Sequence, residues 1–66
     1  MNIILNGKLR EIGPNRSLAA LLVALELADK RVAVEVNGEI VPRSQHATYE
    51  LASNDEVEIV IAVGGG

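Results

Sequence analysis

The chain has 66 residues, of which 48% are apolar, and a net charge of −3. A chain of this length forms one small domain, which buries only about 60% of the surface that its unfolded form exposes. There is no cysteine and only one histidine, which excludes disulfides, thiolate zinc sites, a cysteine nucleophile and a His-rich metal site. Nothing in this composition points to a self-sufficient enzyme.

The charge and the aromatic content indicate which kinds of molecule the chain can bind. Tyr49 is the only aromatic residue, so a base-stacking platform for single-stranded nucleic acid is missing. Residues 1–43 carry a net charge of +1 and residues 44–66 a net charge of −4. The C-terminal third is therefore expected to face a basic partner rather than a phosphate backbone. The N-terminus turns polar too early for a signal peptide or a membrane span, so a cytoplasmic protein without nucleic acid or membrane as partner is expected.

The first predicted element is a β-hairpin. The apolar run of residues 2–6 stops at Asn6-Gly7, a dipeptide that supplies the positive φ angles of a type I′ turn. Residues 8–12 follow as a second strand. Leu9 lies there between charged residues, a pattern that suits an edge strand.

Residues 17–27 are predicted to form the main helix. Ser17 is a good N-cap, because its hydroxyl accepts from free backbone N–H groups of the first turn. An apolar stripe with the spacing i, i+3, i+4 and i+7 follows at Leu18, Leu21, Leu22 and Leu25. The helix is expected to end near residues 28–30, where this period stops.

A second hairpin is predicted after the helix. Residues 32–36 alternate with period two, Asn37-Gly38 supplies the turn, and residues 39–41 form a short strand. Pro42 has no backbone N–H to donate, so this strand must stop there or lie at an edge. Residues 43–53 show no clear period, and a short helical turn with irregular chain is expected.

The last predicted strand, residues 56–63, has the clearest alternation. Its inward positions are Val57, Ile59, Ile61 and Val63, and its outward positions are Glu56, Glu58, Val60 and Ala62. The first and last strands are the most apolar and are expected side by side at the centre of the sheet. The predicted core consists of Leu18, Leu21, Leu22, Leu25, Val34, Val36, Val57, Ile59 and Ile61.

This order of elements predicts an α+β fold of the β-grasp, or ubiquitin-like, type. One main helix would pack on one face of a mixed sheet of four to five strands. Residues 1–63 are expected to form a single domain, and residues 64–66 a flexible glycine tail.

The common catalytic constellations are missing. No glycine-rich phosphate loop leads from a strand into the helix, and no spacing joins a serine to His46 as nucleophile and base. His46 lies in a polar stretch and is expected to be exposed and without function. Asp55, Glu56 and Glu58 offer too few oxygen ligands for calcium and are interpreted as a solvated face. We therefore expect neither a catalytic residue nor a metal site.

The remaining feature is the terminal triplet Gly64-Gly65-Gly66, which holds half of the chain's six glycines. Three residues without Cβ make a thin, pliable tail, with the α-carboxylate at its tip. Such a tail can enter a narrow active site of another protein and present its carboxylate to ATP. Adenylation would give that carboxylate an AMP leaving group, which a sulfur, thiol or amine nucleophile displaces. The alternative is a frayed end without function.

Three segments and the length carry a resemblance to a known family. They are Ile-Ile-Leu-Asn-Gly at residues 3–7, Val-Asn-Gly-Glu-Ile-Val-Pro-Arg at residues 36–43, and residues 54–66 with the glycine ending. Over essentially its whole length the chain resembles the ThiS family, the sulfur carriers of thiamine biosynthesis. It departs from the family in having His46 where a tryptophan is common and Asn54-Asp55 where Gly-Asp is usual.

The resemblance implies a carrier mechanism without a bound cofactor. A ThiF-type enzyme would use ATP to adenylate the Gly66 carboxylate, and sulfur from cysteine, supplied by a desulfurase, would then replace AMP. The resulting thiocarboxylate would donate its sulfur to thiazole synthase, ThiG. Gly64 and Gly65 would be recognised as the tail, and the carrier itself would be a monomer. Partner contacts are expected from Arg43, Glu56, Glu58, Val60 and Ala62.

Other functions share some of these features. Gly-Gly tails also occur in the small subunit of molybdopterin synthase and in ubiquitin-like modifiers. The alternatives are therefore a sulfur carrier for molybdopterin or tRNA thiolation, a protein modifier, and a plain β-grasp binding module with an incidental tail.

Overall fold

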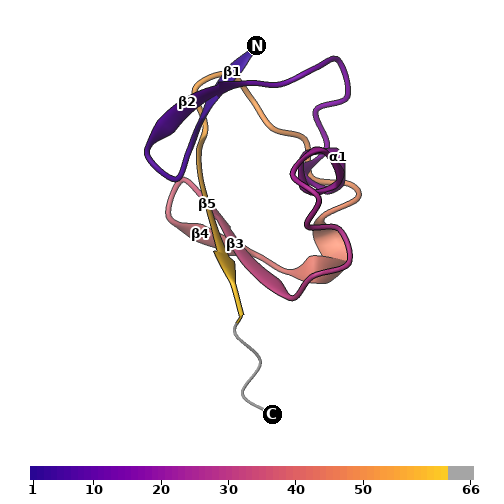
Figure 1. The fold of residues 1–66 in the computed structure, drawn as a ribbon. Helices are drawn as coiled ribbons and strands as arrows, with labels where there is room; N and C mark the ends of the chain where they lie inside the picture. Colours follow the sequence, from indigo (N-terminus) through magenta and orange to yellow (C-terminus); the bar gives the residue numbers. More distant parts are fainter. Residues whose placement is uncertain (63–66) are drawn as a thin grey trace.

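Five strands form one mixed sheet, and the helix α1 packs across one of its faces (Figure 1). The computed structural model describes residues 1–62; the predicted strand position Val63 and the predicted glycine tail lie outside the described residues. The elements are β1 (Asn2–Leu5), β2 (Lys8–Glu11), α1 (Leu18–Ala24), β3 (Val32–Val36), β4 (Glu39–Val41), the 3₁₀ turn η1 (Arg43–Gln45) and β5 (Glu56–Ile61). This architecture confirms the predicted α+β fold of the β-grasp type.

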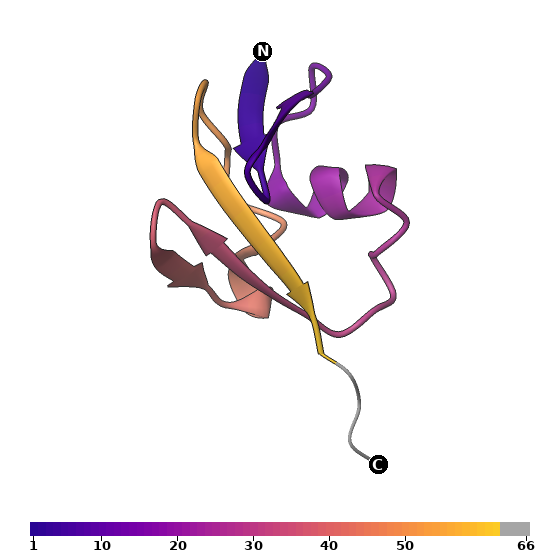
Figure 2. The same cartoon turned by 60° about the vertical axis from the view of Figure 1, so that its left-hand side comes forward.

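The strand β5 lies at the centre of the sheet, in the order β2-β1-β5-β3-β4. It runs parallel to β1, with Ile4 opposite Glu56, and antiparallel to β3, from Val36 opposite Val57 to Val32 opposite Ile61. Figure 2 shows β5 crossing between the β1–β2 hairpin and the β3–β4 hairpin. The prediction that the first and last strands pair at the sheet centre is confirmed.

Both Asn-Gly turns have the predicted positive φ angles, and the asparagine of the first turn does more than turn the chain. Asn6 has φ 48° and Gly7 has φ 82°. The Asn6 side chain reaches β5, where its Oδ1 accepts from the backbone N–H of Ile59 at 2.9 Å. Its Nδ2 donates to the Ile59 carbonyl at 3.3 Å. Because β1 ends at residue 5, these two bonds extend the β1–β5 pairing by means of a side chain.

The asparagine of the second turn holds β5 from its other side. Asn37 has φ 52°, and its Oδ1 accepts from the backbone N–H of Glu56 at 2.9 Å. Its Nδ2 donates to the Asp55 carboxylate at 3.0 Å, and its backbone N–H donates to the Glu56 carbonyl at 2.7 Å. The two hairpin turns are thus fastened to β5 by contacts that no local sequence pattern predicts.

The helix begins as predicted and ends sooner. Ser17 is the N-cap, and its Oγ accepts from the backbone N–H of Ala20 at 3.1 Å. The end is a Schellman motif, in which Glu26 adopts φ 61° and the backbone N–H of Leu27 donates to the Leu22 carbonyl at 2.8 Å. This motif stops α1 three residues before the predicted end. No helix formed by residues 1–62 has the length and hydropathy needed to cross a membrane.

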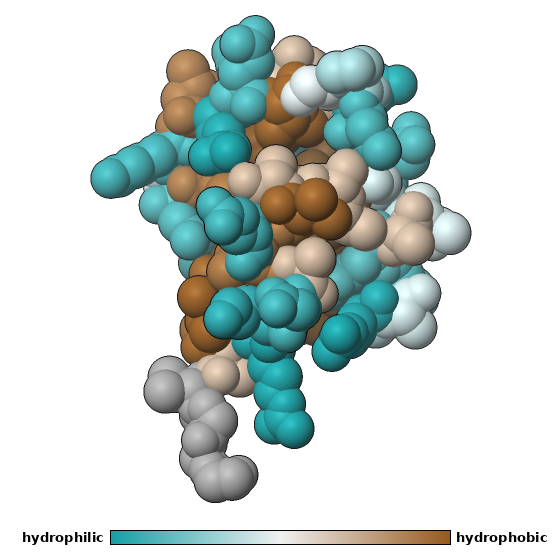
Figure 3. Space-filling view, turned by 45° about the vertical axis from the view of Figure 1, so that its right-hand side comes forward, coloured by the Kyte–Doolittle hydropathy of each residue, from teal (hydrophilic) through white to brown (hydrophobic). Residues whose placement is uncertain are grey.

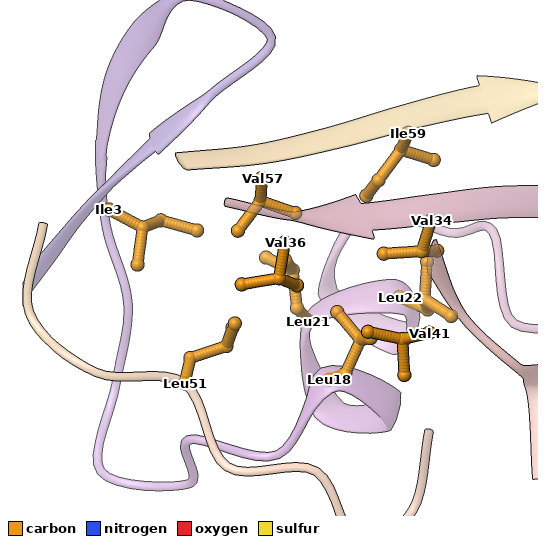
Figure 4. Close-up of a cluster of buried hydrophobic side chains, with 10 residues drawn as sticks. All are labelled: Ile3, Leu18, Leu21, Leu22, Val34, Val36, Val41, Leu51, Val57 and Ile59. Carbon is orange, nitrogen blue, oxygen red and sulfur yellow. The ribbon is translucent and has the colours of Figure 1, made fainter. Parts of the chain in front are cut away.

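The core lies between α1 and the sheet (Figure 4). Its buried residues are Ile3, Leu18, Leu21, Leu22, Val34, Val36, Val41, Leu51, Val57 and Ile59. The prediction is thereby confirmed for seven of its nine residues. Leu25 is only partly buried, although it packs against the core. Ile3, Val41 and Leu51 were not predicted.

The prediction of an inward, buried Ile61 is wrong, since 51% of this residue is exposed. Ile61 follows the alternation of Val57 and Ile59, but at the end of β5 the sheet has lost a neighbour. The pairing with β1 reaches only to Val57, whereas the pairing with β3 continues to Ile61. The last residues of β5 therefore have a neighbouring strand on one side only. Figure 2 shows this end of β5 extending beyond the hairpin of β1 and β2.

The prediction of an exposed His46 is also wrong, since only 6% of this residue is exposed. Its Nε2 lies 3.0 Å from the Val41 carbonyl, which can only accept, so this nitrogen carries the proton. Its backbone carbonyl accepts from the N–H of Ala19 at 3.0 Å, one of the free donors in the first turn of α1. His46 therefore ties the chain after β4 to both β4 and the helix.

Replacing Asn6 with glycine tests the contact between the first turn and β5. Glycine tolerates the positive φ, but the variant loses both side-chain hydrogen bonds to Ile59. Because each such bond contributes about 0.5–1.5 kcal/mol, we expect the free energy of unfolding in urea to fall by about 1–3 kcal/mol.

The matched control is Asn54→Gly. Asn54 also has a positive φ, 70°, and its side chain forms no hydrogen bond within residues 1–62. We expect this variant to unfold at nearly the same urea concentration as the parent chain. Equal losses in the two variants would contradict the role given to the Asn6 side chain.

Candidate functional site

The face of the sheet that points away from α1 is the candidate site. The cross-strand register places its residues on one side: Leu9 is opposite Ile4, Ile4 is opposite Glu56, and Glu58 is opposite Glu35. We call this surface the open face. It consists of Asn2, Ile4, Leu9, Glu11, Ala33, Glu35, Ile40, Glu56, Glu58 and Val60.

The open face carries large apolar side chains that no part of the described chain covers. Leu9 is 70% exposed, Ile40 is 65% exposed and Val60 is 63% exposed. They come from β2, β4 and β5, so they span the sheet from one edge strand to the other. Single exposed apolar residues are ordinary, but several on one face are typical of a docking surface.

The charges of the open face are of one sign. Glu35 and Glu58 are directly opposite each other on β3 and β5, and Glu56 lies two residues along β5 on the same side. Like charges in directly opposite positions destabilise a sheet. The strand positions that form the open face include no lysine or arginine. The face therefore presents a negative potential that favours a basic partner surface.

The structure brings together most of the residues that the sequence predicted for partner contact. Glu56, Glu58 and Val60 lie on the open face and are exposed, as predicted. Ala62 follows β5, and its backbone N–H donates to the Arg31 carbonyl at 2.9 Å. The chain is thus attached to the sheet as far as residue 62.

Arg43 is separated from this group. It lies in η1, after β4, and lines a hollow beside α1 together with His46. Gly64, Gly65 and Gly66, the predicted modification and recognition residues, lie outside the described residues. Their roles remain predictions.

Sequence reasoning missed the part of the open face that β3 and β4 contribute. The alternation in β3 does place Ala33 and Glu35 outward, so their orientation could have been predicted. The two-residue Asn37-Gly38 turn likewise sets Ile40 opposite Glu35. What the sequence could not predict is the register between β3 and β5, which sets Glu35 beside Glu58. Pairing between segments far apart in the chain decides that register.

The open face offers a partner apolar contact and negative charge. Among residues 1–62 no group of three or more histidines, aspartates and glutamates is placed to hold a metal ion. In the same part of the chain, every buried polar side-chain atom has a hydrogen-bond partner. The function of this surface is best explained by recognition of another molecule.

Comparison with known proteins identifies the family. A model described as the ThiS family matches residues 3–66 of this chain. The sulfur carrier protein ThiS of Bacillus subtilis is 44% identical over 46 residues, which cover 70% of each chain. The crystal structure of a thiamine biosynthesis protein (ThiS) from Geobacter metallireducens superimposes with a TM-score of 0.82, at 33% identity, over 100% of both chains.

Some relatives are much longer than this chain. The thiazole synthase of Paramagnetospirillum magneticum is 39% identical over 66 residues, which is 100% of this chain. The chain spans only 20% of the length of that protein, and likewise 20% of the thiazole synthase of Magnetococcus marinus. A region similar to the whole of this domain is thus found within larger proteins.

Replacing Glu58 with lysine tests the like-charge pair on the open face. The variant sets an ammonium opposite the Glu35 carboxylate, and the two residue types have similarly weak strand preference. We expect the free energy of unfolding at low salt to rise by about 0.2–1 kcal/mol. The gain should shrink at high salt, because salt screens exposed charges.

Glu11→Lys is the control for this variant, since Glu11 lies opposite the uncharged Asn2. We expect its effect on stability to be smaller than that of Glu58→Lys. A Glu58→Lys protein that unfolds at a lower urea concentration than the parent would contradict the interpretation.

Proposed function

The chain belongs to the ThiS family, and from this premise we propose that it is a sulfur carrier of thiamine biosynthesis. The observation that carries the proposal is the extent of the family match, which continues through the glycines to Gly66. On this proposal Gly66 holds the sulfur as a C-terminal thiocarboxylate, and the chain is a co-substrate that supplies no catalytic side chain.

The proposed chemistry has two steps on the Gly66 carboxyl group. In the first, a carboxylate oxygen attacks the α-phosphate of ATP on a ThiF-type enzyme, and pyrophosphate leaves. In the second, a cysteine-derived sulfur nucleophile at the oxidation level of sulfide attacks the carbonyl carbon. The carbon–oxygen bond to AMP breaks, AMP leaves with the electron pair, and the thiocarboxylate remains.

The composition of the chain suits this chemistry. With no cysteine, the chain can hold activated sulfur only at its own terminus. Without a thiol it also forms no mixed disulfides with the thiols or disulfides of its partners. Glycines at the tip keep the tail thin enough for a narrow active site, because they have no Cβ.

Docking on the open face would aim the tail. The strand β5 contributes Glu56, Glu58 and Val60 to that face, and the chain is tied to the Arg31 carbonyl at residue 62. Four residues follow Ala62 in the sequence, with a reach of at most roughly 14 Å when extended. The partner's reaction centre must therefore lie within that distance of the end of the sheet.

The longer relatives support thiazole synthase as the acceptor of the sulfur. In those proteins, a region similar to this entire chain is part of the same polypeptide as a thiazole synthase. Joining carrier and acceptor in one chain raises their effective concentration. This observation favours thiazole synthesis over molybdopterin synthesis or tRNA thiolation, which use the same tail chemistry.

Intact mass measurement tests the carrier function. After incubation with its cognate activating enzyme, ATP and a cysteine-derived sulfur source, the chain is expected to gain the mass of one sulfur minus one oxygen. The gain should disappear when Gly66 is deleted, while the circular dichroism spectrum stays unchanged. An unchanged mass with an activating enzyme that modifies a control carrier would exclude the proposal.

The Glu58→Lys variant tests docking of the open face on the activating enzyme, because it is expected to weaken docking while it raises the stability of the chain. If the open face binds a basic surface of the activating enzyme, the reversed charge should slow the mass gain several-fold at low salt, although the variant is expected to be the more stable protein. The control is Asp29→Lys, the same charge reversal in the loop between α1 and β3. Equal rates for the two variants would show that the open face does not dock this enzyme.

A further inference from the structure

A hollow of about 230 Å³ lies beside α1, on the opposite side of the sheet from the open face. It is lined by Ala19, Leu22, Val23, Ala28, Arg43, His46 and Ala47. Figure 3 shows apolar residues gathered over α1, bordered by hydrophilic side chains. The proposed sulfur transfer uses neither this hollow nor its two polar residues.

The apolar lining suits a flat and sizeable group. Three of the lining residues are alanines, whose small side chains leave space in the hollow. Val23, which also lines it, is 63% exposed. A cavity of about 150 Å³ is known to hold benzene in another protein. A hollow of about 230 Å³ therefore has room for a larger ring system.

His46 gives the hollow a fixed hydrogen-bond acceptor. The residue is only 6% exposed, and the Val41 carbonyl engages the protonated Nε2 at 3.0 Å. In the neutral ring Nδ1 is then an acceptor. It forms no hydrogen bond within residues 1–62, and that part of the chain has no fully buried side-chain nitrogen or oxygen without a partner, so Nδ1 keeps some exposed surface. Because His46 lines the hollow, Nδ1 can accept from a donor that enters there.

We propose that this hollow binds a tryptophan side chain of a partner protein, with the indole N–H donating to Nδ1 of His46. The ring would pack on Leu22, Val23 and the alanines. Arg43, the second polar residue of the hollow, suits an aromatic ring because a guanidinium is attracted to its π face. Tryptophan is also enriched among the residues that dominate binding energy at interfaces.

This contact goes beyond the sulfur-carrier proposal and does not depend on it. The hollow and the open face lie on opposite sides of the sheet. A partner held at the hollow would leave the open face free for a second protein. The place of Arg43, apart from the other predicted contact residues, is then explained by a second surface.

The test uses N-acetyl-tryptophanamide as the probe, titrated into isotope-labelled protein and followed by amide NMR. We expect saturable shifts confined to the lining residues, among them Ala19, Val23 and Ala47. The 1-methylindole analogue cannot donate to Nδ1, so it should bind about fivefold more weakly, as expected for the loss of one hydrogen bond. Equal affinity of the two probes, or shifts scattered over the protein, would overturn the proposal.

Two alanine variants locate the site. Ala47→Leu fills the hollow and should weaken probe binding at least fivefold. Ala24→Leu is the control, because Ala24 is also exposed but lines a different hollow, of about 270 Å³, beside Ile12 and Pro14. Equal effects of the two variants would contradict the assignment.

The same two variants test whether the hollow binds a side chain of a partner protein or a free small molecule. The affinity of each variant is measured separately for the cognate activating enzyme and for thiazole synthase. We expect Ala47→Leu, but not Ala24→Leu, to bind at least one partner fivefold more weakly. Unchanged affinity for both would overturn docking at the hollow. That result would leave the mass gain at Gly66 untouched, so this proposal and the sulfur-carrier proposal fail separately.

Discussion

The position of β5 is the constraint on which the other features depend, and two asparagine side chains help to hold it. Asn6 bonds both backbone groups of Ile59, and Asn37 bonds the backbone N–H of Glu56. Regular pairing between β1 and β5 covers only two residue pairs, so the Asn6 side chain completes what the short first strand cannot. One face of β5 then supplies the core, and its other face supplies the acidic residues of the open face.

Local patterns predicted those parts of the fold that local chemistry decides. Asn-Gly tolerates the positive φ angles that a tight hairpin turn requires, Ser17 accepts from a free helix donor, and alternation separates Val57 from Glu58. Burial is different, because it depends on which layer covers a residue. The alternation of β5 is unbroken at Ile61, yet this residue is exposed because the sheet narrows there. His46 lies in a polar stretch but is buried, since its ring bonds the end of β4 and its backbone carbonyl bonds the first turn of α1.

The candidate site was predictable to a similar degree. The outward half of β5 follows from the sequence, whereas the carboxylate of Glu35 joins it only through a register that spans 23 positions of the chain. That register opposes two negative charges, which stability alone does not favour. A surface that gives up stability to keep one sign of charge is typical of a functional surface. The hollow with Arg43 and His46 depends on a helix that ends early and a loop without period, so no pattern in the sequence indicated it.

The order of the strands also has a consequence for biosynthesis. Both hairpins pair with β5, which follows them in the chain, and β1 and β3 do not pair with each other. While residues 56–61 are still within the ribosome, each hairpin has only itself, and isolated hairpins are marginally stable in water. Folding of the sheet must therefore await the emergence of β5 from the ribosome. A polypeptide that terminates before β5 leaves its apolar strands unprotected and is a substrate for proteases, so the folded sheet is found only in chains synthesised beyond residue 61.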